Sequence, residues 1–200
     1  MRPALLLAAL ALVSCKKEEE REPSPLLDVP QSEQFAIEGL SADGHVVFDD
    51  AGVPHVYGAS DEDAAAIHGF IAAQQRFLQI DLGRRLGRGT LTELVGDLAL
   101  DADVEAVQGG VRVMTEKVIA AATPEQLAAF EAYARGVNAW IALVQAGDLD
   151  APSEYETLAP LLGYAEPGDM LSPMEAADIA GVITFFTLTA GFDDREVGWT

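Results

Sequence analysis

The sequence is poor in cysteine. Cys15 is the single cysteine among 200 residues, so no disulfide bond can form within the chain. Basic residues are also scarce, with 12 Lys and Arg against 33 Asp and Glu, which gives a formal net charge of −21. Such an acidic surface repels nucleic acid and anionic lipid, so we expect no nucleic-acid partner. The acidic excess by itself indicates only solubility.

Motifs of several enzyme classes are missing as well. The chain has no Gly-x-x-x-x-Gly-Lys-Ser/Thr loop, no Gly-x-Ser-x-Gly turn, no His-Glu-x-x-His motif and no Cys-x-x-Cys pair. Two of its three histidines, His45 and His55, flank a predicted hairpin, but without a placed third ligand they make a poor metal site. The third, His68, is more typical of a packed or hydrogen-bonded side chain than of a ligand. The residues alone therefore contain no complete catalytic set, and we assign no catalytic residue.

A short apolar segment stands at the N terminus. Arg2 precedes an Ala- and Leu-rich run at residues 4–12, which is too short to span a bilayer but suits a signal peptide. The run ends Leu-Val-Ser-Cys, which resembles a bacterial lipobox and predicts cleavage before Cys15 and lipidation of its sulfur. We therefore expect a lipid-anchored protein of the bacterial cell envelope, with this anchor as its one membrane contact. The alternative is an ordinary signal peptide with an incidental cysteine.

Three regions follow from these patterns. Residues 1–14 form the predicted lipoprotein signal peptide. Residues 15–34 are acidic and contain prolines, so they have little to bury and are typical of a tether. Residues 35–200 have the hydrophobic content for a core, and we expect this folded region to be incomplete at its C-terminal end.

The folded region begins with a predicted β-hairpin. The β-branched and aromatic residues at 46–48 and 53–57 are separated by a turn in which Gly52 supplies a positive φ. Ser60, followed by three acidic residues, then predicts the start of a helix that runs to about Arg85. The expected fold class is α+β, mostly helical, with a short N-terminal hairpin.

Polar residues interrupt the apolar face of that first helix. Gln74, Asp81 and Arg85 fall on or beside the face at helical spacing. Arg84 lies within one turn of Asp81, so the two can form an ion pair. Buried polar groups need partners, and the pattern therefore predicts a small internal polar network. We interpret it as structural, holding neighbouring segments in place, with a catalytic role as the less favoured alternative.

Capping boxes and helical spacing predict the remaining elements. The boxes begin at Thr90, Thr123 and Ser172. Trp140 is expected to be a core anchor. The predicted helices cover residues 91–95, 101–122 with a break near 109–110, 124–146 and the segment from Ser172 to Gly191. Residues 148–168 contain three prolines and are expected to be a loop with a short buried segment at 158–164.

Residues 52–96 carry a family resemblance. They read GVPHVYGASDEDAAAIHGFIAAQQRFLQIDLGRRLGRGTLTELVG, which combines a Gly-x-Pro-His hairpin, an acidic helix cap, a doubled arginine and Gly-x-Leu-x-Glu-Leu-x-Gly. This order resembles the N-terminal region of the penicillin acylase family of serine N-terminal-nucleophile (Ntn) amidohydrolases. Looser similarity continues at residues 132–141 and 172–194. One departure is Gln75, where the family usually has Asp.

The resemblance implies an αββα Ntn-hydrolase fold, of which this chain is the α-chain part. Family members are cut from precursors into an α chain and a longer β chain. The new N-terminal serine of the β chain is the nucleophile, and its own α-amine, with a pKa near ~8, acts as the base. The resemblance thus implies a β-chain partner, an acyl amide substrate and no cofactor for catalysis.

Two sets of site residues are carried over from the resemblance. The last long α-chain helix lines the acyl pocket in the family, which points to Ile183, Phe186 and Thr187, although an ordinary core role is the alternative. Some members bind a structural calcium ion through a carboxylate just after this helix, which points to Asp194 or Glu196.

We therefore expect the N-terminal, α-chain-like part of a penicillin acylase-type amidase. Its substrates include β-lactam side chains or N-acyl-homoserine lactones as possibilities. A second hypothesis is a truncated or orphan, non-catalytic envelope lipoprotein that acts as a binding or assembly module. A third is an envelope lipoprotein with a merely similar helical segment.

Overall fold

The structure is a computed structural model that describes residues 29–191. The chain divides into two units at Gln34 and Phe35, and the fold below is that of the second unit. The predicted signal peptide, Cys15 and most of the predicted tether lie outside the described residues. Within residues 29–191, no helix combines the length and the apolar character needed to cross a membrane.

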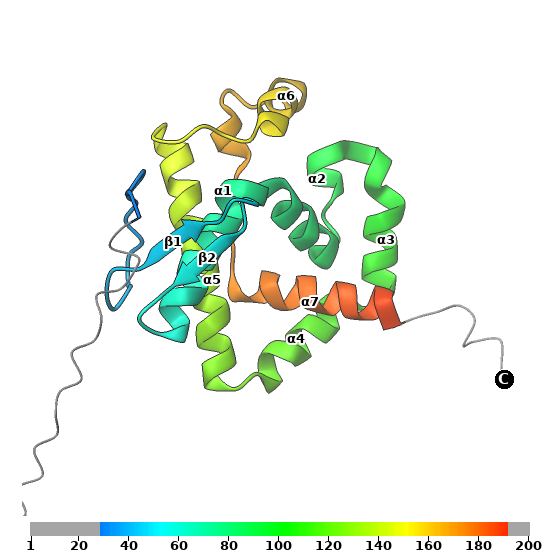
Figure 1. Cartoon of the computed structure of the whole chain (residues 1–200). Coiled ribbons are helices and arrows are strands. Elements are labelled where there is room, and N and C mark those ends of the chain that lie inside the picture. The colour runs from blue at the N-terminus through cyan, green and yellow to red at the C-terminus, as the bar shows by residue number, and fades with distance from the viewer. Residues whose placement is uncertain (1–28, 192–200) are drawn as a thin grey trace, which may run out of the picture. The chain divides into compact units, whose positions relative to one another are not determined.

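The second unit is mostly helical, with one two-stranded antiparallel sheet in its described part (Figure 1). The predicted fold class is therefore confirmed. The elements in chain order are β1 (His45–Phe48), β2 (Pro54–Tyr57), α1 (Asp61–Arg88), α2 (Thr92–Val95), η2 (Gly96–Ala99), α3 (Leu100–Gln108), α4 (Val111–Ala121), α5 (Pro124–Ala146), α6 (Ser153–Leu162), η3 (Pro167–Met170) and α7 (Ala176–Gly191).

The hairpin has the predicted turn. Val46 lies opposite Val56 and Phe48 opposite Pro54 in the antiparallel register. The Asp49 carboxylate accepts backbone N–H groups from Ala51 and Val53, each at 2.9 Å. Gly52 has φ +77°, a conformation that costs glycine least. The turn is thus closed by one aspartate and one glycine.

Helix α1 has a capping residue at each end. The Ser60 hydroxyl accepts the Asp63 N–H at 3.1 Å, as predicted, and the helix ends at Gly89 in the left-handed region. It therefore extends three residues beyond the predicted Arg85. Arg76 departs from helical geometry, with φ −146° and ψ 33°, and kinks the helix. The hydrophobic spacing gave no sign of this kink.

The core forms where α1 packs against α5. Phe77 of α1 stacks on Trp140 of α5 with ring centroids 5.0 Å apart, and Trp140 is buried, as predicted. Two glycines let the backbones approach: a Cβ on Gly136 would lie 1.8 Å from the Ala66 carbonyl oxygen, and one on Gly69 would lie 2.1 Å from that of Tyr133. This close crossing fixes the position of α5 relative to α1.

Helix α7 crosses the C-terminal end of α1 and also contacts α4 and α5 (Figure 1). Gly87 of α1 meets Gly181 of α7, where a Cβ on Gly87 would lie 3.0 Å from the Gly181 carbonyl carbon. No side chains separate the two backbones at this point. This close approach and the polar contacts at the start of α7 position that helix against α1.

Some predicted boundaries are confirmed and others are wrong. The break between α3 and α4 and the Thr123–Gln126 capping box are as predicted. The predicted loop at 148–168 instead contains α6, which Pro152 precedes and Gly163 ends. Pro160 lies near the end of α6, where its missing N–H removes one helical bond only. Tyr155 and Ala159, one turn apart, bury the inner face of this helix.

Candidate functional site

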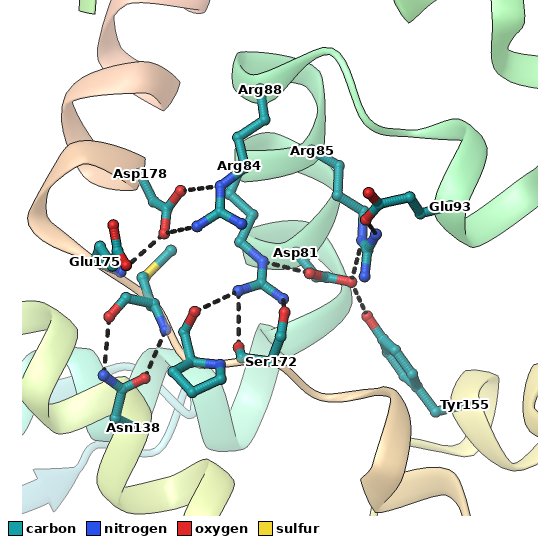
Figure 2. Close-up of polar contacts among 12 residues, drawn as sticks. Asp81, Arg84, Arg85, Arg88, Glu93, Asn138, Tyr155, Ser172, Glu175 and Asp178 are labelled. Atoms are coloured by element: carbon teal, nitrogen blue, oxygen red, sulfur yellow. Dashed lines mark hydrogen bonds and ion pairs between the residues drawn. The ribbon is translucent and has the colours of Figure 1, made fainter. Parts of the chain in front are cut away.

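The most strongly polar part of the interior is centred on Asp81 (Figure 2). Its side chain is fully buried on α1 and accepts hydrogen bonds from Arg84 Nε at 2.5 Å, Arg85 Nε at 2.9 Å and Tyr155 Oη at 2.6 Å. Three donors thus surround one carboxylate. They compensate for water that the buried group has lost.

Burial and partners act in opposite directions on the pKa of Asp81. Burial alone raises the pKa, whereas the charge of Arg84, the hydroxyl of Tyr155 and the guanidinium of Arg85 lower it, and the net pKa lies below its usual range. Burial and the Asp81 charge together raise the pKa of Tyr155. The pair is therefore an ionised acceptor and a neutral donor.

Arg84 connects α1 to the segment that leads into α7. Its Nη1 donates to the carbonyl oxygens of Ser172 at 2.8 Å and Pro173 at 3.1 Å, and its Nη2 donates to Ser172 Oγ at 2.7 Å. The predicted capping box at Ser172 is wrong, because α7 begins at Ala176 and the Ser172 hydroxyl faces Arg84 instead. Arg84 is buried, so these contacts exclude water.

Arg88 makes a second connection to α7. Its Nε and Nη2 donate to the two carboxylate oxygens of Asp178 at 2.5 and 2.7 Å, and Asp178 also accepts the Glu175 N–H at 2.8 Å (Figure 2). The sequence pattern predicts neither residue. The predicted helix ends at about Arg85, one turn before Arg88, and nothing local to Asp178 indicates a partner ninety positions away.

Arg85 and Asp103 organise the short helix α2. Arg85 Nη1 donates to Glu93 Oε2 at 3.0 Å, and the Asp103 carboxylate accepts the N–H groups of Leu91 and Thr92 at 2.7 and 2.8 Å. The predicted Thr90–Glu93 capping box is therefore wrong, because α2 has no side-chain cap from within its own turn. A carboxylate from α3 caps it instead, which local sequence does not reveal.

The structure brings Asp81, Arg84 and Arg85 together but places Gln74 elsewhere. Gln74 is half-buried and lines a cavity of about 350 Å³ at the kink of α1, together with Phe77, Trp140 and Pro152. Among residues 29–191, no side-chain hydrogen bond connects Gln74 to the Asp81 group. The kink at Arg76 separates Gln74 from the regular second half of the helix.

The three residues predicted for an acyl pocket share one face of α7. Ile183 and Phe186 are 47% and 57% exposed, and Thr187 beside them is exposed as well. The Thr187 hydroxyl donates to the Ile183 carbonyl oxygen at 2.7 Å, so its proton is bound within the helix. This face is exposed in the part of the chain that the structure describes, and its role in an acyl pocket or in a core completed by a partner stays a prediction.

The candidate metal ligands and the predicted lipidation site lie partly within and partly outside residues 29–191. The part of the chain that the structure describes holds no group of three or more His, Cys, Asp or Glu placed to bind a metal ion. His55 Nε2 lies 3.2 Å from Asp49 Oδ2, and His68 packs edge-on against Tyr133. The predicted calcium ligands Asp194 and Glu196 and the predicted lipidation site Cys15 lie outside the described residues.

The described residues also contain no nucleophile paired with a base. Across residues 29–191, no serine or threonine hydroxyl is hydrogen-bonded to a histidine or lysine. Their partners are carbonyl oxygens, carboxylates, helix-capping amides and, for Ser172, the Arg84 guanidinium. What the polar side chains do instead is join α1 to α2, α6 and α7. This arrangement of the described residues can position an exposed apolar helix face.

The chain is similar to known proteins in sequence and in fold. The family model for penicillin amidase matches residues 43–196. Penicillin acylase 2 proenzyme of Pseudomonas sp. strain SE83 is 34% identical over 113 residues, which cover 56% of this chain and 15% of that protein. The acyl-homoserine lactone acylase QuiP of Pseudomonas putida is 32% identical over 138 residues, covering 69% of this chain and 16% of that protein. The chain thus spans about a sixth of these relatives.

A solved structure has the same fold. The thermostable penicillin G acylase from Alcaligenes faecalis matches with a TM-score of 0.64 and 24% sequence identity, over 76% of this chain and 76% of the solved chain. The Ntn-hydrolase fold expected from the sequence is confirmed by this match. The third hypothesis, a merely local similarity, is wrong because the family match extends over residues 43–196.

Proposed function

The chain belongs to the penicillin amidase family as its N-terminal region, and from this premise we propose that it is the α-chain-like part of an amidase that hydrolyses acyl amides. It contributes structural residues and part of the acyl pocket. The nucleophile belongs to a β-chain region that is not among these 200 residues.

The proposal is supported by comparing the length of this chain with the lengths of the solved chain and of the curated relatives. The solved penicillin G acylase chain and this chain are matched over 76% of each, so their lengths are similar. The curated relatives are matched over only 15 and 16% of their own lengths. The solved chain is therefore short compared with these relatives, and one of them is named a proenzyme. A division into a short and a long chain agrees with the missing nucleophile in the described part of this one.

The proposed reaction is acyl transfer to water through the partner's N-terminal serine. Its hydroxyl attacks the amide carbon while its α-amine takes the hydroxyl proton. The protonated α-amine then gives this proton to the leaving amine as the C–N bond breaks, and water hydrolyses the acyl-enzyme to the carboxylic acid and the free serine. This chain contributes the α7 face with Ile183, Phe186 and Thr187 to the acyl pocket. Two exposed apolar side chains there favour an apolar acyl group, since burial stabilises by roughly 25 cal/mol per Å² of apolar surface. β-Lactam side chains and N-acyl-homoserine lactones both carry such groups.

Hydrolysis by the complete gene product tests the proposal. We expect the full precursor, expressed in a bacterial host that can export it, to release p-nitroaniline from phenylacetyl or hexanoyl p-nitroanilide. The 200-residue chain alone should release none. Turnover by the chain alone would contradict our placement of the nucleophile. A gene that ends at Thr200 and a product without amidase activity would instead favour the non-catalytic binding or assembly module.

We also propose that Cys15 is lipidated and anchors the protein in the cell envelope. The proposal rests on the lipobox-like residues 12–15. Metabolic labelling with a fatty-acid analogue should mark the wild type and leave the Cys15→Ser variant unlabelled. Label on the variant, or soluble wild type without label, would contradict the anchor.

A structural calcium ion held by Asp194 or Glu196 with β-chain ligands is a further proposal, because carboxylate oxygens suit this ion. Elemental analysis of the processed protein after dialysis should then find calcium. The Asp194→Asn and Glu196→Gln variants identify which of the two carboxylates holds it. Protein without bound calcium would contradict the proposal.

A further inference from the structure

Among residues 29–191, the polar contacts that join α7 to other elements lie at its N-terminal end. Arg84 binds the carbonyl oxygens of Ser172 and Pro173, and the Asn138 amide exchanges two hydrogen bonds with the Met174 backbone at 2.9 and 2.7 Å (Figure 2). These contacts fix the segment before the helix. The next one along, Arg88 with Asp178, is the first within the helix itself.

We propose that Arg88 and Asp178 are positioning residues that set the tilt and depth of α7 in the acyl pocket, and so determine which acyl chains the enzyme accepts. This inference rests on the proposed function. In this role, neither Arg88 nor Asp178 touches the substrate. They act through Ile183 and Phe186, which the same helix presents.

The geometry of the pair favours control of orientation. Two parallel N–H···O bonds fix the angle between guanidinium and carboxylate, which one bond would leave free. The Asp178 side chain is 2% exposed, whereas that of Arg88 is 42% exposed. The buried carboxylate also accepts the Glu175 N–H, so the pair couples α1 directly to the first turn of α7.

The close crossing of α1 and α7 provides the point about which α7 can tilt. Gly87 faces Gly181 there, and a Cβ on the nearby Gly83 would lie 3.4 Å from the Val182 side chain, so the Arg88–Asp178 pair acts beside a packed contact. Ile183 lies about 7.5 Å and Phe186 about 12 Å beyond Asp178 along the axis, at 1.5 Å per residue. A small change of angle at Asp178 is therefore enlarged where the acyl chain would bind. At about 100° per residue, these two side chains also point away from the side that meets α1.

The test uses the complete processed enzyme and two conservative variants. Arg88→Lys keeps the charge but cannot form two parallel bonds. Asp178→Asn keeps an acceptor for the Glu175 N–H but removes the charge. Arg112→Lys is the matched control, because Arg112 is an exposed arginine on the neighbouring α4 whose distance to Glu116 is 3.8 Å. The probes are p-nitroanilides of phenylacetic, hexanoic and decanoic acids, with the active fraction measured by titration.

We expect the ratio of kcat/KM between decanoyl and phenylacetyl substrates to change about threefold or more in both variants, mainly through KM. This is part of the ~10-fold or larger discrimination that one methylene can give in an apolar pocket. Arg112→Lys should leave the ratio unchanged. Equal losses in kcat for all substrates, with unchanged KM and ratio, would show a structural role only and overturn the inference. A wild type that hydrolyses none of the probes would overturn the proposed function and this inference with it.

Discussion

Asp81 shows how one residue joins distant parts of the chain. Its carboxylate accepts from two arginines of its own helix and from Tyr155, which lies on α6, 74 positions later. Without these donors a buried charge would be strongly destabilising. The sequence predicted that Asp81 would meet Arg84 or Arg85, because these lie one turn away. It did not predict Tyr155, because the segment around it was read as a loop.

Replacing Tyr155 by Phe should destabilise the complete protein by roughly 1.5–3 kcal/mol near neutral pH, the usual value for a hydrogen bond to a charged group. The pKa of Asp81 is lowered in the folded state, so its contribution is present above the unfolded value of about 4 and is lost as pH falls through the folded pKa. The gap between wild type and Tyr155→Phe should therefore stay constant down to about pH 4 and shrink only as pH falls through the lowered folded pKa of Asp81.

Urea unfolding from pH 7 to pH 3 measures this gap. The control is Tyr164→Phe, which changes an exposed tyrosine just after α6 and should leave stability unchanged. A gap that shrinks well above pH 4 would contradict an ionised Asp81 as the acceptor.

At the scale of elements, the sequence predicts helix caps and turns that depend on neighbouring residues, but it does not predict contacts between distant segments. Ser60, Thr123 and the hairpin turn act within a few residues, and the sequence predicted them correctly. The capping of α2 by Asp103 and the contact of Ser172 with Arg84 depend on segments far apart in the chain. The pocket role of Ile183, Phe186 and Thr187 follows only from the family resemblance and stays a prediction, because their apolar spacing is equally typical of a core helix.

The crossing of α1 and α5 gives a prediction at this scale. A Cβ on Gly136 would lie 1.8 Å from the Ala66 carbonyl oxygen, and backbone cannot yield as a flexible side chain can. Gly136→Ala should therefore destabilise the protein by about 1–3 kcal/mol or more. Gly168→Ala is the control, since its Cβ would lie an ordinary 3.5 Å from Gln145 Cα. Equal stability of the two variants in thermal unfolding would contradict the close helix crossing.

At the scale of the whole molecule, apolar side chains remain exposed on several elements. Leu98, Val107 and Leu161 are exposed, in addition to Ile183 and Phe186 on α7. The hairpin is a sheet of two strands, which is marginal without further strands. These surfaces agree with a chain that is completed by a partner region.

The isolated 200-residue chain should therefore aggregate or be molten. Its thermal unfolding, followed by near-ultraviolet circular dichroism, should lack a sharp transition, and it should bind a hydrophobic dye. The processed two-chain protein is the control and should unfold cooperatively. A soluble monomer of the chain alone with a sharp transition would count against a requirement for the partner.

The central claim is that this chain is one part of an amidase whose nucleophile lies in a second chain. N-terminal sequencing of the purified, active protein tests it most directly. We predict two chains, the second beginning with serine, and a Ser→Ala change at that position should abolish amide hydrolysis. An active protein that consists of one uncut chain, or whose second chain begins with a residue that has no nucleophilic side chain, would contradict the claim.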